Sequence, residues 1–145
     1  MPKISIRKAK VDDIGQCAKI YFEEFSKQDV HWSLRTARAR VKQSILKDPK
    51  WCFVILHERK IIGVLLAERL DFVKGKSIQI QDIVIMVQYQ NKGYGARLLR
   101  HLERSARKSN YKGIYLTGNT LGAAGKFYKK LGFLKTQYMF MGKEL

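Results

Sequence analysis

The chain has 145 residues, the length of one ordinary domain and enough to bury a core of its own. It contains no apolar run of about eighteen residues, and its first residues lack the apolar segment of a signal peptide. We therefore expect neither a membrane span nor a secretory leader, and a single domain over residues 1–145 in a soluble, cytoplasmic protein without a membrane partner.

The charge of the chain is strongly one-sided. It has 29 Lys and Arg residues against 12 Asp and Glu residues, which gives a net charge of +17 at pH 7. Such a field favours nucleic acid, acidic proteins and phosphorylated ligands alike, and a solvated basic surface explains it equally well. The two cysteines, Cys17 and Cys52, and the three histidines follow no metal or redox spacing, so we expect buried free thiols and no metal site.

The first part of the chain predicts a strand followed by two helices. Residues 3–9 alternate in the manner of a half-buried strand, and Asp12 or Asp13 can cap the helix that follows. A second helix is predicted over residues 34–47, and Pro49 ends it. Its inward positions are Leu34, Ala37, Val41, Ser44 and Ile45, and its basic residues, mostly outward, are Arg35, Arg38, Arg40 and Lys42.

The rest of the chain alternates strands and helices. Two apolar runs, 51–56 and 60–70, flank a short turn and predict an antiparallel hairpin, and residues 78–87 form a further strand. A helix over 94–108 and a strand over 113–117 follow. A short helix then precedes one or two more strands over residues 133–141.

A glycine-bearing loop, Gln90–Ala96, lies between the predicted strand 78–87 and the predicted helix 94–108. Backbone N–H groups at the start of a helix suit a phosphate or pyrophosphate, and glycine lets the backbone approach it closely. The loop lacks the Gly-Lys-Ser/Thr ending of a P-loop, and Leu98 stands where a dinucleotide fingerprint needs its third glycine. A plain tight turn also explains the glycines.

Two motifs together resemble the GNAT superfamily of acyl-CoA-dependent N-acyltransferases. The first is Gln-x-x-Gly-x-Gly in the loop, and the second is residues 123–133, in which a short helix carries Tyr128 and ends in Leu-Gly-Phe. The resemblance implies an α/β fold: a single-domain, GNAT-like, mixed and mostly antiparallel central sheet, with about four flanking helices and strands that splay after the fourth. It also implies acetyl-CoA as co-substrate.

The resemblance implies a cofactor site built mainly from backbone. The pyrophosphate would be held by amides of Lys92, Gly93, Tyr94, Gly95 and Ala96, with Gln90 bracing the loop. Amides around Ile85 and Val87 would bind the acyl oxyanion, and Val87 stands where many relatives have proline, so a strand distortion is expected there. Relatives commonly carry asparagine where this chain has Leu121, and Asn119 is the nearest replacement for that cofactor contact.

Three chemical tasks remain for such an enzyme: a base, an oxyanion donor and an acid. By resemblance, Tyr128 is the acid that protonates the leaving thiolate, and a phenol with a pKa of about 10 can do so. For the base we select Asp82, with Gln81 inseparable from it by sequence alone. Other carboxylates that stay open for that role are Glu23, Glu24, Glu68 and Asp71.

The leading hypothesis is an acetyl-CoA-dependent N-acetyltransferase that moves the acetyl group directly to a primary amine of a small molecule, protein or peptide. The alternative is a nucleic-acid-binding or regulatory module on a GNAT fold, using arginines of the predicted helix 94–108. A basic surface that attracts an acidic acceptor is a third role, and a homodimer stays open. Candidates for acceptor contacts, with core packing as their other role, are Tyr21, Phe22, Phe25, His31 and Trp32.

Overall fold

The structure is a computed structural model that describes residues 1–28, 31–118 and 122–145. The chain forms two compact units, Met1–Tyr115 and Leu116–Leu145, and each is described by itself. The strands are β1 (Ile4–Lys8), β2 (Phe53–His57), β3 (Lys60–Phe72), β4 (Gly75–Ile85) and β5 (Gly113–Leu116). The α-helices are α1 (Ile14–Phe25), α2 (Leu34–Lys47), α3 (Tyr94–Lys108) and α4 (Gly122–Lys130), and the short 3-10 helices are η1 (Val11–Asp13), η2 (Pro49–Trp51) and η3 (Val87–Tyr89). This is the α/β fold expected from the sequence.

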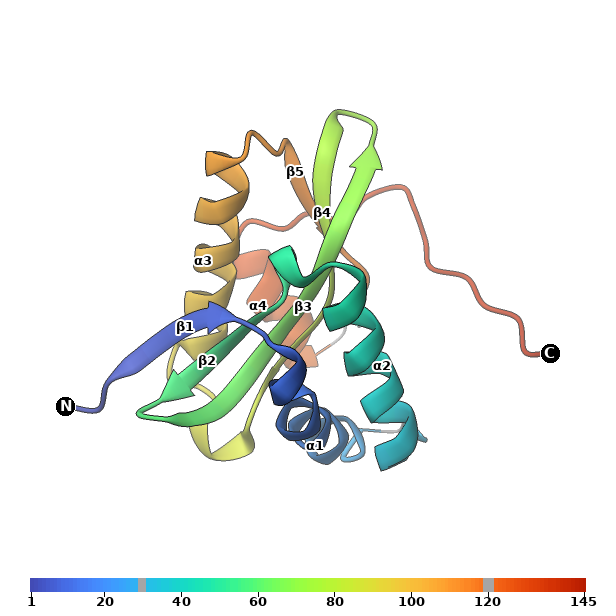
Figure 1. The fold of residues 1–145 in the computed structure, drawn as a ribbon. Helices are drawn as coiled ribbons and strands as arrows, with labels where there is room; N and C mark the ends of the chain where they lie inside the picture. The colour runs from blue at the N-terminus through green and yellow to red at the C-terminus, as the bar shows by residue number, and fades with distance from the viewer. Residues whose placement is uncertain (29–30, 119–121) are drawn as a thin grey trace. The chain divides into compact units, whose positions relative to one another are not determined.

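The strands form one sheet in the order β1-β2-β3-β4-β5, and each neighbouring pair from β1 to β4 is antiparallel. The helices of the first unit lie on both faces of this sheet (Figure 1). Two consecutive side chains show that the helices lie on opposite faces. Cys52, just before β2, has its Sγ 3.5 Å from the Ser44 carbonyl of α2, whereas Phe53, the first residue of β2, packs on His101 of α3. Because consecutive side chains of a strand point to opposite faces, α2 and α3 cover different sides of the sheet.

The core lies at the centre of the sheet. In β3 every residue from Ile62 to Ala67 except Gly63 is an apolar residue with almost no exposed surface, as expected of a strand covered on both faces. Cys17 and Cys52 are buried free thiols, as the sequence predicted. Burial raises the pKa of Cys17 to about 12 and that of Cys52 to about 11, so neither thiol ionises near neutral pH.

Several sequence expectations are confirmed and some are wrong. The helix over 34–47 and the hairpin are confirmed, but Leu34 is 54% exposed because it occupies the first position of α2, beyond the buried stripe. Asp13 accepts the Lys10 N–H at the start of the first helical segment. The strands expected over 133–141 are wrong, since this segment contains no strand. Apolar and aromatic residues favour a strand only where they can pack and pair against a neighbouring strand. The single domain over 1–145 stays a prediction.

Within the described ranges, no helix combines the length and apolar character required to cross a membrane.

Candidate functional site

The glycine-bearing loop connects the end of β4 to the start of α3. After Ile85 the chain leaves the sheet and makes one turn of 3-10 helix, η3, so the distortion expected near Val87 takes this form. Asn91 and Gly93 then have positive φ angles of 61° and 84°, and Gly93 is the residue that caps α3. The loop therefore turns sharply between the end of β4 and the first turn of α3.

The loop can accept an anion. The Arg97 N–H is the first to bond back to the capping residue, at 3.0 Å from the Gly93 carbonyl, so the amides of residues 94–96 have no partner within the helix. The capping residue is a glycine and has no side chain to bond these amides. A Cβ at Gly93 would meet no atom within 4 Å, which leaves open space beside the loop. The backbone here fits a phosphate or pyrophosphate.

Cations gather beside the same loop around the Tyr89 ring. The ammonium nitrogens of Lys60 and Lys92 lie 6.0 and 5.9 Å from its centroid. The Tyr89 ring also lies 5.1 Å from the His57 ring and 6.4 Å from the Tyr94 ring. These positive charges reinforce the helix terminus in favouring a negatively charged group.

The Glu24 carboxylate binds the other end of the loop. Its oxygens accept hydrogen bonds from the Val87 N–H at 3.2 Å and from the Gln90 side-chain amide at 3.0 Å. The same Gln90 amide also donates to the Ile85 carbonyl at 2.8 Å. Glu24, Gln90 and the end of β4 thus form one hydrogen-bonded group that fixes the path of η3. In this arrangement the Val87 amide, expected from sequence to serve the acyl oxyanion, is bonded to Glu24.

A β-bulge in β4 brings Gln81 and Asp82 to the same face. The register of β3 with β4 shifts there: Leu66 pairs with Asp82 and Ala67 with Ile80, which leaves Gln81 as the extra residue. A bulge turns a side chain that would otherwise alternate away. Both side chains therefore contact α2, Gln81 through Ser44 at 3.2 Å and Asp82 through Arg40 Nε at 3.1 Å.

Asp82 lies in a polar cluster within the core. Its side chain is 12% exposed, it pairs with Arg40, and it accepts a hydrogen bond from the buried Tyr21. Burial raises the pKa of Asp82, and Arg40 followed by Tyr21 opposes that rise without cancelling it. Burial, followed by the charge of Asp82, raises the pKa of Tyr21. Asp82 is thus a carboxylate with increased proton affinity, which suits a general base.

The other carboxylates that the sequence left open have different surroundings. Glu68 pairs with Lys47 at 2.7 Å, Asp71 pairs with Arg69 at 2.9 Å, and Glu23 is exposed. Asp82 lies on β4 itself, and Glu24 contacts Val87 and Gln90, which follow β4. They are linked through α1, because Tyr21 and Glu24 lie three residues apart on that helix and contact Asp82 and η3 respectively.

Aromatic side chains surround the Tyr21 ring. Its centroid lies 4.5 Å from that of Phe25 and 5.0 Å from that of Trp32. Tyr21 is 2% exposed, so it belongs to the core rather than to an open wall. Phe22, Phe25 and Trp32 remain half-buried.

The second unit contains Tyr128 on α4. Gly132 takes a φ angle of 93°, which ends the helix and lets the Phe133 N–H donate to the Tyr128 carbonyl at 3.0 Å. The Tyr128 ring packs against Phe127 and Phe133, with centroid distances of 5.2 and 5.8 Å. The Leu-Gly-Phe motif therefore ends the helix. Its Phe133 and the preceding Phe127 both contact the half-buried Tyr128 ring. Asn119 lies outside the described residues.

Sequence reasoning missed two side chains of the first unit. Arg40 was expected to face outward, yet it reaches Asp82, and Glu24 was one carboxylate among several, yet it binds the loop. Neither contact has a local signal, since the partners are separated by 42 and 63 residues. Among the described residues, no group of three or more His, Cys, Asp or Glu side chains is arranged to hold a metal ion.

Comparisons with known proteins identify the family and the fold. The model of the Acetyltransferase (GNAT) family matches residues 15–133, which is most of the chain. The uncharacterized N-acetyltransferase CgeE of Bacillus subtilis (strain 168) is 33% identical over 60 residues, which cover 41% of this chain. The chain matches only 23% of the length of CgeE.

Solved structures show the same fold. A protein described as a possible acetyltransferase from Clostridium difficile 630 superposes with a TM-score of 0.82 at 20% identity, covering 98% of this chain and 97% of that one. A protein described as a predicted acetyltransferase from Clostridium acetobutylicum, solved with acetyl-CoA, has a TM-score of 0.76 at 18% identity, covering 97% and 96%. An aminoglycoside acetyltransferase from an uncultured soil metagenomic sample, in complex with sisomicin, has a TM-score of 0.74 at 16% identity, covering 98% and 96%. On the strength of the family match over residues 15–133, the chain belongs to the GNAT acetyltransferase family.

Proposed function

We propose that this protein is an acetyl-CoA-dependent N-acetyltransferase that transfers the acetyl group directly to a primary amine. The observation that carries the proposal is the loop after β4, where Gly93 has a left-handed backbone and the first amides of α3 have no partner within the helix. Support for acetyl-CoA comes from the family match and from the Clostridium acetobutylicum relative, which was solved with it.

The residues of the loop divide the binding of coenzyme A between them. The amides of the glycine turn and the first helical turn hold the pyrophosphate, and the Gln90 side chain keeps the loop against the Ile85 carbonyl. The backbone at Ile85 and Val87 serves the acyl oxygen, and for Val87 this requires its N–H to exchange the hydrogen bond to Glu24 for one to the acyl group. The amides assigned to the pyrophosphate are those of Lys92, Gly93, Tyr94, Gly95 and Ala96.

Starting from an alkyl ammonium, the nitrogen must lose two protons, and the leaving sulfur gains one. An alkyl ammonium with a pKa of about 10.4 must lose a proton before its nitrogen attacks the thioester carbon. Asp82 receives that proton directly or through water, and its raised proton affinity favours this role. When the tetrahedral intermediate collapses, the C–S bond breaks and the thiolate takes the proton of the Tyr128 hydroxyl. The second proton of the nitrogen leaves through water and restores the Tyr128 phenol. The role of Tyr128 rests on the resemblance and on its phenol chemistry.

The acceptor is an amine of a small molecule, a protein or a peptide. The net charge of +17 repels polycationic acceptors at long range and attracts acidic ones. We therefore expect neutral or acidic amine acceptors to give a higher kcat/KM than polyamines. Because this repulsion is screened by salt, the difference should narrow as ionic strength rises.

The direct test is a calorimetric titration of the purified protein with acetyl-CoA and with coenzyme A, because it needs no acceptor. We expect binding by the native chain and at least about tenfold weaker binding by Gly93→Val, whose side chain occupies the space beside the loop. A left-handed φ also strains valine, so Gly93→Asn separates the two effects, since asparagine tolerates this conformation.

If Gly93→Asn also weakens binding while its thermal unfolding matches that of the native chain, bulk beside the loop is responsible and the cofactor site is supported. Gly142→Ala is the matched control, because its Cβ meets no atom within 4 Å and its backbone is not left-handed. Absence of acetyl-CoA binding by the folded native protein would overturn the proposed function.

A further inference from the structure

The outer edge of β1 directs backbone groups away from β2, and among them the Lys8 carbonyl accepts a hydrogen bond from the Arg7 side chain at 3.1 Å. The sheet order places β1 at one edge, beside β2 alone (Figure 1). The Ala9 N–H donates to the Cys52 carbonyl at 2.9 Å, and the Glu58 N–H donates to the Lys3 carbonyl at 2.7 Å. Odd-numbered residues of β1 therefore direct their backbone groups toward β2, and the even-numbered residues Ile4, Ile6 and Lys8 direct theirs outward.

A basic hollow lies beside this edge. Its volume is about 320 Å³, and it is lined by Ile6 of β1 and by Arg97, Arg100 and Arg104 of α3. The three arginines are exposed and follow one another at helical spacing, three and four residues apart. Ile6 contributes a half-buried apolar floor. The hollow thus joins a free strand edge to a row of cations.

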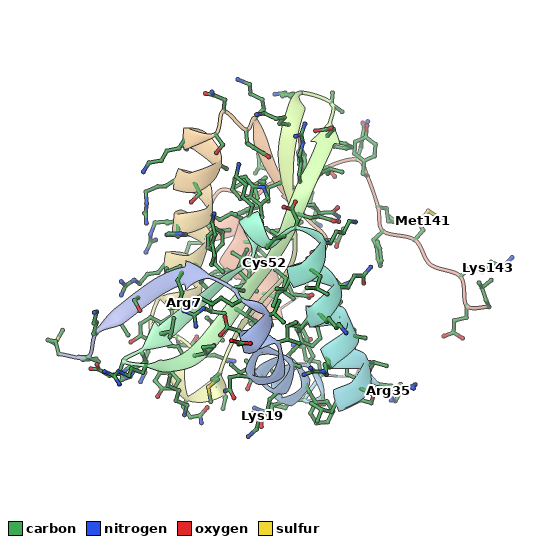
Figure 2. The ribbon with its side chains drawn as sticks, viewed as in Figure 1. Arg7, Lys19, Arg35, Cys52, Met141 and Lys143 are labelled. Atoms are coloured by element: carbon green, nitrogen blue, oxygen red, sulfur yellow. The ribbon has the colours of Figure 1, made fainter. Side chains whose placement is uncertain are left out.

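The charge in this hollow is not compensated from within. No ion pair in the described part of the chain includes Arg97, Arg100 or Arg104. By contrast Arg7, which lies on β1 (Figure 2), is paired with Asp13. The positive field is also felt by His101, whose pKa is lowered by burial and then by Arg104 and Lys108. A ligand of this hollow must therefore bring negative charge.

We propose that β1 and the arginine row of α3 form a docking site for an acidic peptide segment that binds in extended conformation as an additional strand. The backbone of the segment pairs with the outward N–H and C=O groups of β1. Every second side chain then points to the α3 side, because side chains alternate along a strand. Aspartate or glutamate at these positions reaches the arginines.

Other occupants explain less of the arrangement. A nucleic acid could bind the arginines through its phosphates. Its phosphates do not form hydrogen bonds along the edge of β1 as a peptide backbone does, so that edge would contribute nothing to its binding. A second copy of this chain could pair edge to edge, but it would bring its own arginine row and Lys8 against those of the first copy. An acidic strand satisfies both the edge and the charge. This inference does not depend on the proposed acetyl transfer.

The test uses a fluorescent peptide in which glutamate alternates with valine, titrated into the full chain and followed by anisotropy. We expect saturable binding that weakens as salt rises. Replacing glutamate by lysine should abolish binding. A version with methylated backbone nitrogens on its pairing edge keeps every charge but loses its strand hydrogen bonds, and we expect it to bind at least about fivefold more weakly.

The double variant Arg100→Glu/Arg104→Glu tests the hollow, and Arg107→Glu/Lys108→Glu is its matched control. Both doubles change the net charge equally and lie on exposed positions of α3, but only the first alters the hollow. We expect the first to weaken peptide binding by roughly tenfold more than the second. Thermal unfolding of each variant checks the fold, and unchanged acetyl-CoA titration separates this result from the test of the cofactor loop.

Three outcomes would overturn the proposal. One is equal weakening by the two doubles, and another is equal binding of the methylated and unmethylated peptides. The third is an oligonucleotide of matched charge that binds more tightly than the peptide and loses that affinity in the Arg100→Glu/Arg104→Glu variant. Each would mean that the surface responds to charge alone.

Discussion

Asp13 and Asp82 each pair with an arginine in the first unit, but the pKa of Asp13 is lowered and that of Asp82 is raised. The exposed fractions of their side chains are similar, at 9% and 12%, but Asp82 lies deeper in the fold, and burial is the largest cause of its pKa shift. The number of donors also differs. Asp13 accepts two bonds from Arg7, at 2.7 and 3.0 Å, and one from the Lys10 N–H at 2.7 Å. Asp82 receives only one nitrogen of Arg40, at 3.1 Å, and the Tyr21 hydroxyl.

The comparison shows that one arginine does not decide the charge state of a carboxylate in a core. At Asp13 the bidentate contact outweighs burial, whereas at Asp82 burial outweighs a single contact. Their contributions to stability therefore have opposite pH dependence. That of Asp13 is present above its unfolded pKa and is lost as pH falls through the folded value. That of Asp82 is present below its unfolded pKa and is lost as pH rises through the folded value.

The largest effect is expected from Asp82→Asn. Loss of a general base lowers turnover by roughly 10²–10⁴-fold, and asparagine keeps the size of the side chain. The measurement is kcat at saturating acetyl-CoA with an amine acceptor identified by screening, alongside the acetyl-CoA titration. We expect kcat to fall while the affinity for acetyl-CoA stays unchanged, because Asp82 does not touch the loop amides.

The same substitution in the other pair, Asp13→Asn, is the matched control for activity. Asp13 is bonded to the end of β1 and to the entry of α1, away from the loop after β4. We expect its kcat to stay close to that of the native chain. If Asp13→Asn and Asp82→Asn lowered kcat alike, the loss would reflect damage to the fold, and Asp82 would no longer be the base.

Local patterns were sufficient to predict much of this molecule. The buried stripe and Pro49 define α2, whose bounds were predicted as the structure has them, and the glycine spacing located the turn before α3. These features depend on residues a few positions apart, where helical period, proline and positive φ act directly. The prediction for the tail was wrong for the same reason, because the apolar residues over 133–141 do not show whether a partner edge exists.

The chemistry around Asp82 could be predicted only in part. Regular strand alternation would place only one of Gln81 and Asp82 on the face toward α2, and the sequence did not show which one. The β-bulge places both side chains against α2. Arg40 and Glu24 gain their roles from partners far along the chain, which no local period encodes. Residue type suggested the candidates, and tertiary packing determined their partners.

A smaller effect is expected from Arg40→Gln, which removes the cation beside Asp82 but leaves a hydrogen-bond donor. Without that charge the pKa of Asp82 rises further, because burial is then less opposed. The acid limb of the kcat against pH profile should move to higher pH. Arg40→Lys keeps the charge and should leave the limb nearer its native position. A limb that stays in place in Arg40→Gln would show that the observed ionisation belongs to another group.

The smallest effect is expected on stability, from Asp13→Asn. Hydrogen bonds to a charged group contribute about 1.5–3 kcal/mol when shielded and exposed ion pairs less than about 1 kcal/mol. Because the Arg7 side chain is 36% exposed, we expect a loss of about 1 kcal/mol in the free energy of unfolding at neutral pH. Urea unfolding of both proteins measures it. The difference should disappear as the pH is lowered through the depressed pKa of Asp13, where the native carboxylate also becomes neutral. A difference that persisted unchanged in acid would mean that Asp13 stabilises the fold by packing rather than by its charge.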